Sequence, residues 1–165
     1  MQRIAVRQSE PPLTNFVVSN LPDAPHRDPQ LAQQACADHQ FIAMLDAYRY
    51  SGGLAPAQEV VALFRRHSDG GPATLTRLIV DQSVICFGWQ STVWLPLFQF
   101  NPPDMSTLPG LGQVLTELNS NFDTWHVANW FAQPNSWLDG ATPTDMLGRD
   151  PKAVINAACA LKAMD

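Results

Sequence analysis

The chain has 165 residues, of which 45% are hydrophobic and 15% charged, and its formal net charge is −5. These values predict one domain with a real core, and they exclude a disordered chain and a protein that attracts nucleic acid through its overall charge. No apolar run approaches the roughly 20 residues that span a bilayer, and the N-terminus lacks the apolar segment of a secretory signal. We therefore expect a cytoplasmic protein with no membrane partner.

Residues 1–30 contain five prolines and one substantial apolar cluster, Leu13 with Phe16–Val18. Proline is excluded from helix interiors and donates no ladder hydrogen bond. The segment is therefore predicted to be a proline-rich, extended arm.

Residues 31–83 have the periodicity of helices. Asp28-Pro29 is typical of a cap followed by proline at the first helical position, and Ser51-Gly52-Gly53 would stop this first helix near Tyr50. Its inward face would hold residues at helical spacing: Ala37, Phe41, Met44, Leu45 and Tyr48. Further helices are predicted from Pro56 and from Pro72, joined by the turn 67–71.

The second and third helices resemble a helix–turn–helix, with four polar residues on the outer side: Arg65, Arg66, Thr74 and Arg77. Such a unit could present Thr74, Thr76 and Arg77 to a major groove. The alternative is two ordinary packed helices with solvated arginines. The small size of the patch and the acidic net charge favour that alternative.

The periodicity then changes to that of strands. Val84–Trp89 and Val93–Phe100 are β-branched and aromatic runs separated by Gln90-Ser91-Thr92, which predicts a β-hairpin. Pro96 lies inside the second run, so this run is expected to be an edge strand or to carry a bulge.

The remainder of the 84–165 unit returns to helix. A leucine stripe spans Leu108–Leu118, and three later helices have their own caps: Asp123, Thr142 in a capping box, and Asp150 before Pro151. The predicted fold class is α+β, predominantly α-helical, with helices packed around one small β-hairpin.

The search for chemistry finds no site. Cys36, Cys86 and Cys159 are far apart in apolar surroundings, so we expect three buried free thiols. The four histidines are scattered, no nucleophile elbow or phosphate-binding loop occurs, and helix capping accounts for the aspartates. We therefore expect a binding protein with no catalytic residue, no metal site and no cofactor.

All five tryptophans lie between residues 89 and 137. Tryptophan dominates protein interfaces because it buries much area at low entropic cost, although packing in the core claims part of this set. Trp125 and Trp130 cannot share one helix face with Val127 and Phe131. We expect one of these tryptophans, or His126, to reach the surface.

The order of motifs in 84–160, about half of the chain, resembles a known family. Trp94-Leu95-Pro96-Leu97-Phe98-Gln99-Phe100 is followed by Trp130-Phe131-Ala132-Gln133-Pro134-Asn135-Ser136-Trp137-Leu138-Asp139-Gly140, then by Pro143, Asp145-Met146-Leu147 and Asp150-Pro151. This order is similar to that of the toxin-binding domain of Xre/MbcA/ParS-type antitoxins. Within it, Pro134–Pro143 is a folding device, in which Trp137 and Leu138 are expected to plug a tight helical corner into the core.

The resemblance implies an antitoxin that binds and occludes a cognate toxin, typically a RES-type protein that attacks NAD. It also implies homodimers and an N-terminal unit that binds operator DNA, but residues 31–83 lack the standard Xre helix–turn–helix sequence. We assign the toxin contacts to Asn135, Trp137, Arg149 and the short C-terminal tail with Lys162. Arg149 is the expected polar anchor because no helix pattern requires a charge there. A DNA-binding regulator and an interaction module with another partner remain the alternatives.

Overall fold

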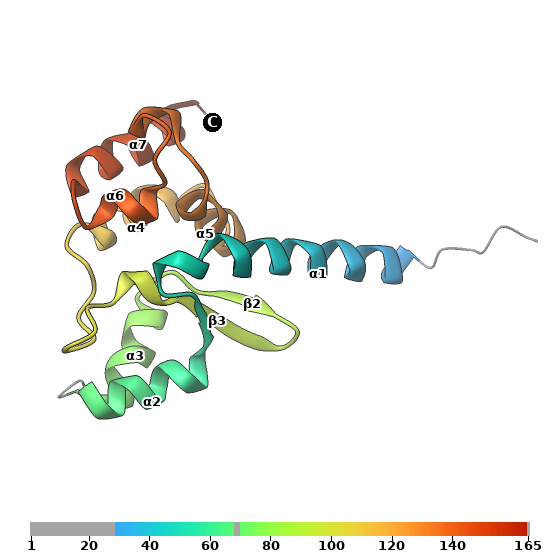
Figure 1. Cartoon of the computed structure of the whole chain (residues 1–165), viewed down its shortest axis with the longest axis vertical. Coiled ribbons are helices and arrows are strands. Elements are labelled where there is room, and N and C mark those ends of the chain that lie inside the picture. Colours follow the sequence, from blue (N-terminus) through green and yellow to red (C-terminus); the bar gives the residue numbers. More distant parts are fainter. Residues whose placement is uncertain (1–28, 68–69, 165) are drawn as a thin grey trace, which may run out of the picture.

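The computed structural model of the chain describes residues 29–67 and 70–164. Most of the predicted arm at 1–30 and the cap Asp28 lie outside these residues. The elements in chain order are α1 (Pro29–Ala47), η1 (Arg49–Ser51), β1 (Leu54–Pro56), α2 (Ala57–His67), α3 (Gly71–Val80), β2 (Phe87–Trp89), β3 (Thr92–Pro96), η2 (Leu97–Gln99), α4 (Leu111–Leu118), α5 (Thr124–Ala132), η3 (Ser136–Leu138), α6 (Pro143–Leu147) and α7 (Pro151–Met164). The fold is α+β and predominantly helical, as predicted (Figure 1).

The sheet is antiparallel with the strand order β1-β3-β2. The predicted hairpin is present, with Gln90 and Ser91 at positive φ in its two-residue turn. Two details of the prediction were wrong. The second run leaves the sheet after Pro96 and forms the turn η2, and β3 is the central strand because β1 pairs with its other edge. Pro96 is tolerated there because it is the last residue of β3, and the next amide, that of Leu97, donates to the Gly53 carbonyl at 3.0 Å.

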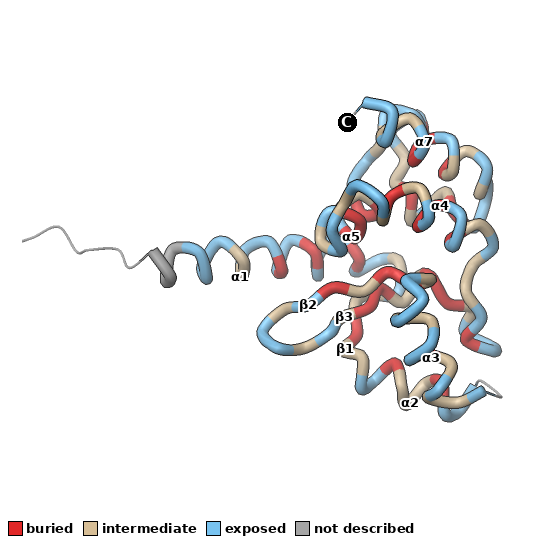
Figure 2. The backbone as a smooth tube through the Cα atoms, turned by 180° about the vertical axis from the view of Figure 1, so that it is seen from behind, coloured by how far each residue is buried: buried red, intermediate tan, exposed pale blue. Residues whose placement is uncertain are grey.

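The sheet separates two hydrophobic clusters. Phe87 and Trp94 lie on the face toward α1, α4, α5 and α7, and they pack with the larger cluster. Ala55 and Leu95 lie on the opposite face and belong to a smaller cluster with residues of α2, α3 and the loop after η2. Figure 2 shows the buried backbone concentrated at the sheet and at the inner sides of α4, α5 and α7. The two clusters therefore pack against opposite faces of the same sheet.

The C-terminal part of α1 anchors this helix to the rest of the fold. Phe41 stacks on Trp89 with a centroid distance of 3.8 Å, Met44 is buried, and the Tyr48 hydroxyl donates to the Ala128 carbonyl at 2.6 Å. Leu45 was predicted to be buried but is exposed, because it lies a quarter turn away from this contact. The preceding turns project clear of the body (Figures 1 and 2).

The caps predicted in the C-terminal half are confirmed. The Asp123 carboxylate accepts from the His126 amide at 2.8 Å, the Thr142 hydroxyl from the Asp145 amide at 3.1 Å, and the Asp150 carboxylate from the Ala153 amide at 3.1 Å. These bonds satisfy amides that have no partner inside their helices. They fix where α5, α6 and α7 begin, and so they fix the connections between these helices.

The prediction of three buried thiols was wrong. Cys36 and Cys159 are exposed, on α1 and α7, and Cys86 is half-buried. The apolar neighbours of Cys36 and Cys159 in the sequence belong to helices that bury only one face, so neighbourhood in the chain did not predict burial. No helix among residues 29–67 and 70–164 is long and apolar enough to cross a membrane.

Candidate partner-binding surface

Residues 133–142 form the corner between α5 and α6, and backbone hydrogen bonds close it. The Asn135 amide donates to the Ala141 carbonyl at 3.0 Å, and the Gly140 amide donates back to the Asn135 carbonyl at 2.9 Å. Asp139 and Gly140 both have positive φ, which turns the chain sharply after η3. Thr144 then ties α6 to α5, because its hydroxyl donates to the Phe131 carbonyl at 2.7 Å. The corner is therefore a fixed platform.

Of the two large side chains of η3, one is buried and the other is exposed. Leu138 is buried in the larger cluster, as predicted. Trp137 was predicted to plug the core, but its side chain is 63% exposed. A three-residue 3-10 turn carries adjacent side chains about 120° apart, so Leu138 and Trp137 cannot both face inward. A rigid corner thus presents a tryptophan to the solvent.

The other proposed contact residues have separate environments. The half-buried Asn135 accepts from the Trp137 amide through its side-chain oxygen at 2.9 Å and thus holds η3 in place. Arg149 follows α6, is exposed, and has no acidic partner among the described residues. The Lys162 ammonium lies 3.1 Å from the Glu117 carboxylate and joins α7 to α4. Trp137 and Arg149 are therefore the exposed, uncommitted members of this set.

The residues of the DNA-binding alternative lie on the other side of the sheet. Arg65 and Arg66 are exposed in the last turn of α2, and Arg77 is exposed in the last turn of α3, where a cation stabilises the helix dipole. Thr74 is half-buried rather than fully outward. Helix α2 packs against α3 and against the strands β1 and β3.

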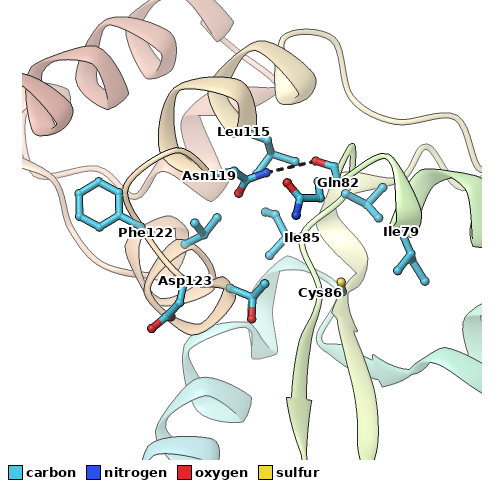
Figure 3. Close-up of a pocket in the computed structure, with 11 residues that line it drawn as sticks. Ile79, Gln82, Ile85, Cys86, Leu115, Asn119, Phe122 and Asp123 are labelled. Carbon is cyan, nitrogen blue, oxygen red and sulfur yellow. Dashed lines mark hydrogen bonds between the residues drawn. The ribbon is translucent and has the colours of Figure 1, made fainter.

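A cleft of about 350 Å3 lies between the segment after α3 and the helices α4 and α5 (Figure 3). Its floor is aliphatic, with Ile79, Ile85 and Leu115, and its mouth holds Gln82 and Asn119, whose amide donates to the Gln82 carbonyl at 3.3 Å. Asp123 at the rim is already engaged as the cap of α5. The lining therefore supports apolar contact more than acid–base chemistry.

Two groups that line this cleft, Asp123 and Cys86, have shifted pKa values. The His126 backbone amide, followed by the His126 side chain, holds the pKa of Asp123 below its ordinary value. Burial raises the pKa of the Cys86 thiol, which makes it a poor nucleophile. The residues that the structure describes contain no group of three or more metal-ligating side chains.

Four tryptophans pack on the larger cluster: Trp89, Trp94, Trp125 and Trp130. The Trp125 indole donates to the Gly88 carbonyl at 3.1 Å and links α5 to the hairpin, and Trp125 and Trp130 are both half-buried. His126, one residue further, is exposed, which confirms that a member of this set reaches the surface. The exposed tryptophan is the one that the sequence placed inside.

The sequence predicts no role for Gln99, although this residue lies in the motif at 94–100. Its side chain is fully buried and makes three hydrogen bonds: Ile85 N–H to Oε1 at 2.7 Å, and Nε2 to the carbonyls of Ile85 and Pro96 at 2.9 Å each. The sequence feature that could have indicated this burial is the position of a polar amide between Phe98 and Phe100 in an apolar run. A buried amide needs partners, so its role there is structural.

No family model, curated protein or solved structure matches this chain.

Proposed function

We propose that this chain is an antitoxin-like protein of the cytoplasm that binds and occludes a partner toxin, and that it has no catalytic activity of its own. The observation that carries the proposal is Trp137, an exposed tryptophan on a corner held by backbone hydrogen bonds. The motif order of residues 84–160, which resembles that of the Xre/MbcA/ParS-type domain, supports the choice of partner.

The energetics of such a surface favour a few fixed anchors. A tryptophan that is already rigid loses little entropy on binding, and its burial between two proteins removes much apolar area from water. Arg149 adds a guanidinium that has no acidic partner among residues 29–67 and 70–164 and can bind a carboxylate in a bidentate manner. Asn135 positions Trp137, and Lys162 pairs with Glu117 between α7 and α4.

The experiment uses the full chain and the RES-type or other toxic protein encoded beside it. Co-expression should restore growth and NAD levels, and the two proteins should co-purify. We expect Trp137→Ala to weaken the complex about 30-fold, the size of a hot-spot loss of roughly 2 kcal/mol, and Arg149→Glu to weaken it further. Val80→Ala, which shortens an exposed side chain on α3, is the matched control and should bind normally.

Two results would overturn the proposal. One is a neighbouring protein that is not toxic, or whose toxicity the chain does not relieve. The other is full binding by the double variant Trp137→Ala/Arg149→Glu with an unchanged melting temperature. NAD turnover by the purified chain alone would contradict the absence of catalysis.

A second candidate is a DNA-binding regulator. Helices α2 and α3 pack against each other, and Arg65, Arg66 and Arg77 are exposed on them. Helix α3 would then enter the major groove with Thr74 and Arg77, while Arg65 and Arg66 would contact phosphates.

A mobility shift on the DNA upstream of the chain's own coding region tests this candidate. We expect affinity to fall steeply with salt, because the arginines release counterions from the phosphates. Arg77→Glu should abolish the shift, and Lys152→Glu, an equal charge change on the exposed side of α7, should not. A shift that Arg77→Glu leaves unchanged, or no shift at low salt, would contradict it.

A further inference from the structure

A pocket of about 660 Å3 opens between η1, the end of α2, η2 and the loop that precedes α4. It is larger than the cleft of Figure 3, and its volume lies in the range of roughly 300–1,000 Å3 that small-molecule sites occupy. In both views of the backbone, the loop after η2 extends toward the end of α2 (Figures 1 and 2). None of the lining elements carries Trp137 or Arg149, so this pocket is separate from the proposed partner-binding surface.

The walls of the pocket are apolar and come from distant parts of the chain. Leu63 belongs to α2, Leu97 and Phe98 to η2, and Met105 and Leu108 to the loop before α4. Leu63, Leu97 and Met105 pack with the smaller hydrophobic cluster, whereas Phe98 and Leu108 pack with the larger one. The pocket therefore lies at the junction of the two clusters, and an apolar ligand in it would contact both.

The loop that carries Met105 holds one wall of the pocket in place. The Asn101 amide donates to the Ser106 carbonyl, and the Met105 amide donates to the Asn101 carbonyl, both at 2.8 Å. Met105 is buried and has φ +58°, a left-handed conformation that is uncommon for a residue other than glycine. Backbone strain of this kind persists only where the surrounding structure enforces it, and it occurs often at ligand sites.

The polar side chains of the lining differ in what they can offer a ligand. The Ser51 hydroxyl donates to the Tyr48 carbonyl at 3.1 Å, and the Asn101 side-chain amide donates to the Ser106 hydroxyl at 2.8 Å. His67 is exposed, and its imidazole has no hydrogen bond to another residue that the structure describes. His67 is therefore the lining side chain best placed to donate to a ligand at the mouth.

The charges around the mouth favour a negative head group. Among the described residues, no aspartate or glutamate lines the pocket. Arg66 follows Leu63 by three residues, which places it on the same side of α2, and no described acid pairs with it. The one acid of the loop, Asp104, accepts from the Ser106 amide at 2.9 Å and is thereby engaged within its own loop. An imidazole donor beside a guanidinium suits a carboxylate.

We propose that this pocket binds a small monocarboxylic acid with an apolar body, a chemistry shared by medium-chain fatty acids and aromatic acids. The body lies against Leu63, Phe98 and Met105, and the carboxylate accepts a hydrogen bond from His67 at the mouth. Because methionine is flexible and polarisable, Met105 adapts to bodies of different shape. Removal of the body from water supplies most of the affinity, and the carboxylate sets the orientation.

Isothermal titration calorimetry of the full chain with octanoate and with 2-naphthoate tests the proposal. We expect one-to-one binding of at least one of these acids, and the tighter of the two shows whether the body is a chain or a ring. Each acid is compared with an alcohol of the same skeleton, 1-octanol or 2-naphthalenemethanol. The alcohol should bind about tenfold more weakly, because it lacks the charge-assisted hydrogen bond.

Two variants test where the acid binds. Leu63→Trp enlarges a half-buried wall residue and should weaken binding about tenfold or more, because the new side chain occupies the pocket. Val80→Trp, the same enlargement at an exposed residue of α3, is its control and should bind normally. His67→Ala should weaken binding of the acid to that of the alcohol, and His39→Ala, which removes an exposed histidine of α1, should not.

Melting curves recorded with and without the acid give a second measure of binding, since a ligand of the folded chain raises the melting temperature. They also show whether Leu63→Trp folds, and the exposed position of His67 keeps the second variant informative if it does not. Neither heat nor a raised melting temperature with either acid would overturn the proposal, and so would unchanged binding by folded Leu63→Trp. Equal affinity of acid and alcohol, or equal effects of His67→Ala and His39→Ala, would also overturn it, because no carboxylate would then be recognised at the mouth.

Discussion

Gln99 is the one polar residue that the described part of the fold buries fully, and its three hydrogen bonds join the segment before β2 to the end of β3. These segments contribute residues to both hydrophobic clusters, so the Gln99 amide holds the sheet in its place between the clusters. We predict that Gln99→Leu, which keeps the volume, destabilises the fold by about 3 kcal/mol or more, because the Ile85 amide and two carbonyls lose their partner.

Urea denaturation followed by circular dichroism measures this loss. Gln113→Leu, the same change at an exposed position of α4, is the control and should shift the free energy of unfolding by less than about 0.5 kcal/mol. Equal stability of Gln99→Leu and the natural chain would show that the three bonds contribute nothing net.

Two glycines at the start of α4 differ in what a side chain would meet. Gly110 has φ +84°, and a Cβ on it would lie 2.7 Å from the Pro151 Cβ, whereas nothing lies within 4 Å of a Cβ on Gly112. We predict that Gly110→Ala lowers stability by about 1–3 kcal/mol, because it strains the backbone and pushes α7 away from α4. Gly112→Ala should raise stability by about 0.5–1 kcal/mol, since alanine favours the helix. Melting curves of the two variants that move in the same direction would contradict the prediction.

At the scale of the element, the helix caps determine where the helices of the C-terminal half begin. We predict that Asp123→Ala lowers the free energy of unfolding by about 1 kcal/mol near neutral pH, because the His126 amide loses its acceptor. Asp123→Asn keeps an acceptor oxygen and should cost only a few tenths of a kcal/mol. The exposed pair with His126 adds little to either value.

The pH dependence gives this prediction a second test. The pKa of Asp123 in the folded chain lies below its ordinary value. The ionised carboxylate therefore stabilises the fold fully at pH values above the ordinary pKa, and this stabilisation is lost as the pH falls through the folded-state pKa. The stability difference between the natural chain and Asp123→Asn should therefore be constant at neutral pH and shrink in acid. A difference that grows as pH falls would show that the carboxylate does not act as an ionised cap.

Elements with their own local signals were predictable from the sequence, and those defined by distant pairing were not. Asp123, Thr142 and Asp150 mark the helix starts because a cap and its amides are three residues apart. Leu54–Pro56 is too short to show a period of two, and it becomes a strand only because β3 supplies a partner some 40 residues later. The outward orientation of Trp137 follows from the turn η3, which the identity of the residue does not encode. The candidate surface could thus be located from the motif, but the side chain that it exposes could not.

At the scale of the whole molecule, the sheet connects two hydrophobic clusters whose unfolding can be followed by different spectroscopic signals. Four tryptophans pack on the larger cluster and none on the smaller one among the described residues. Tryptophan fluorescence therefore reports the larger cluster, while far-UV circular dichroism reports helices of both. If the shared sheet couples the clusters, damage to the smaller one must appear in the fluorescence of the larger one.

We predict that Leu75→Ala, a cavity in the smaller cluster, lowers the free energy of unfolding by about 2–5 kcal/mol and shifts both signals to the same lower midpoint. Val80→Ala on the same helix is the control and should leave both midpoints in place, because its side chain is exposed. Were the fluorescence midpoint of Leu75→Ala unchanged while the dichroism split into two steps, the clusters would unfold independently. The α2–α3 unit would then be separable from the surface around Trp137, and changes in one would not reach the other through stability.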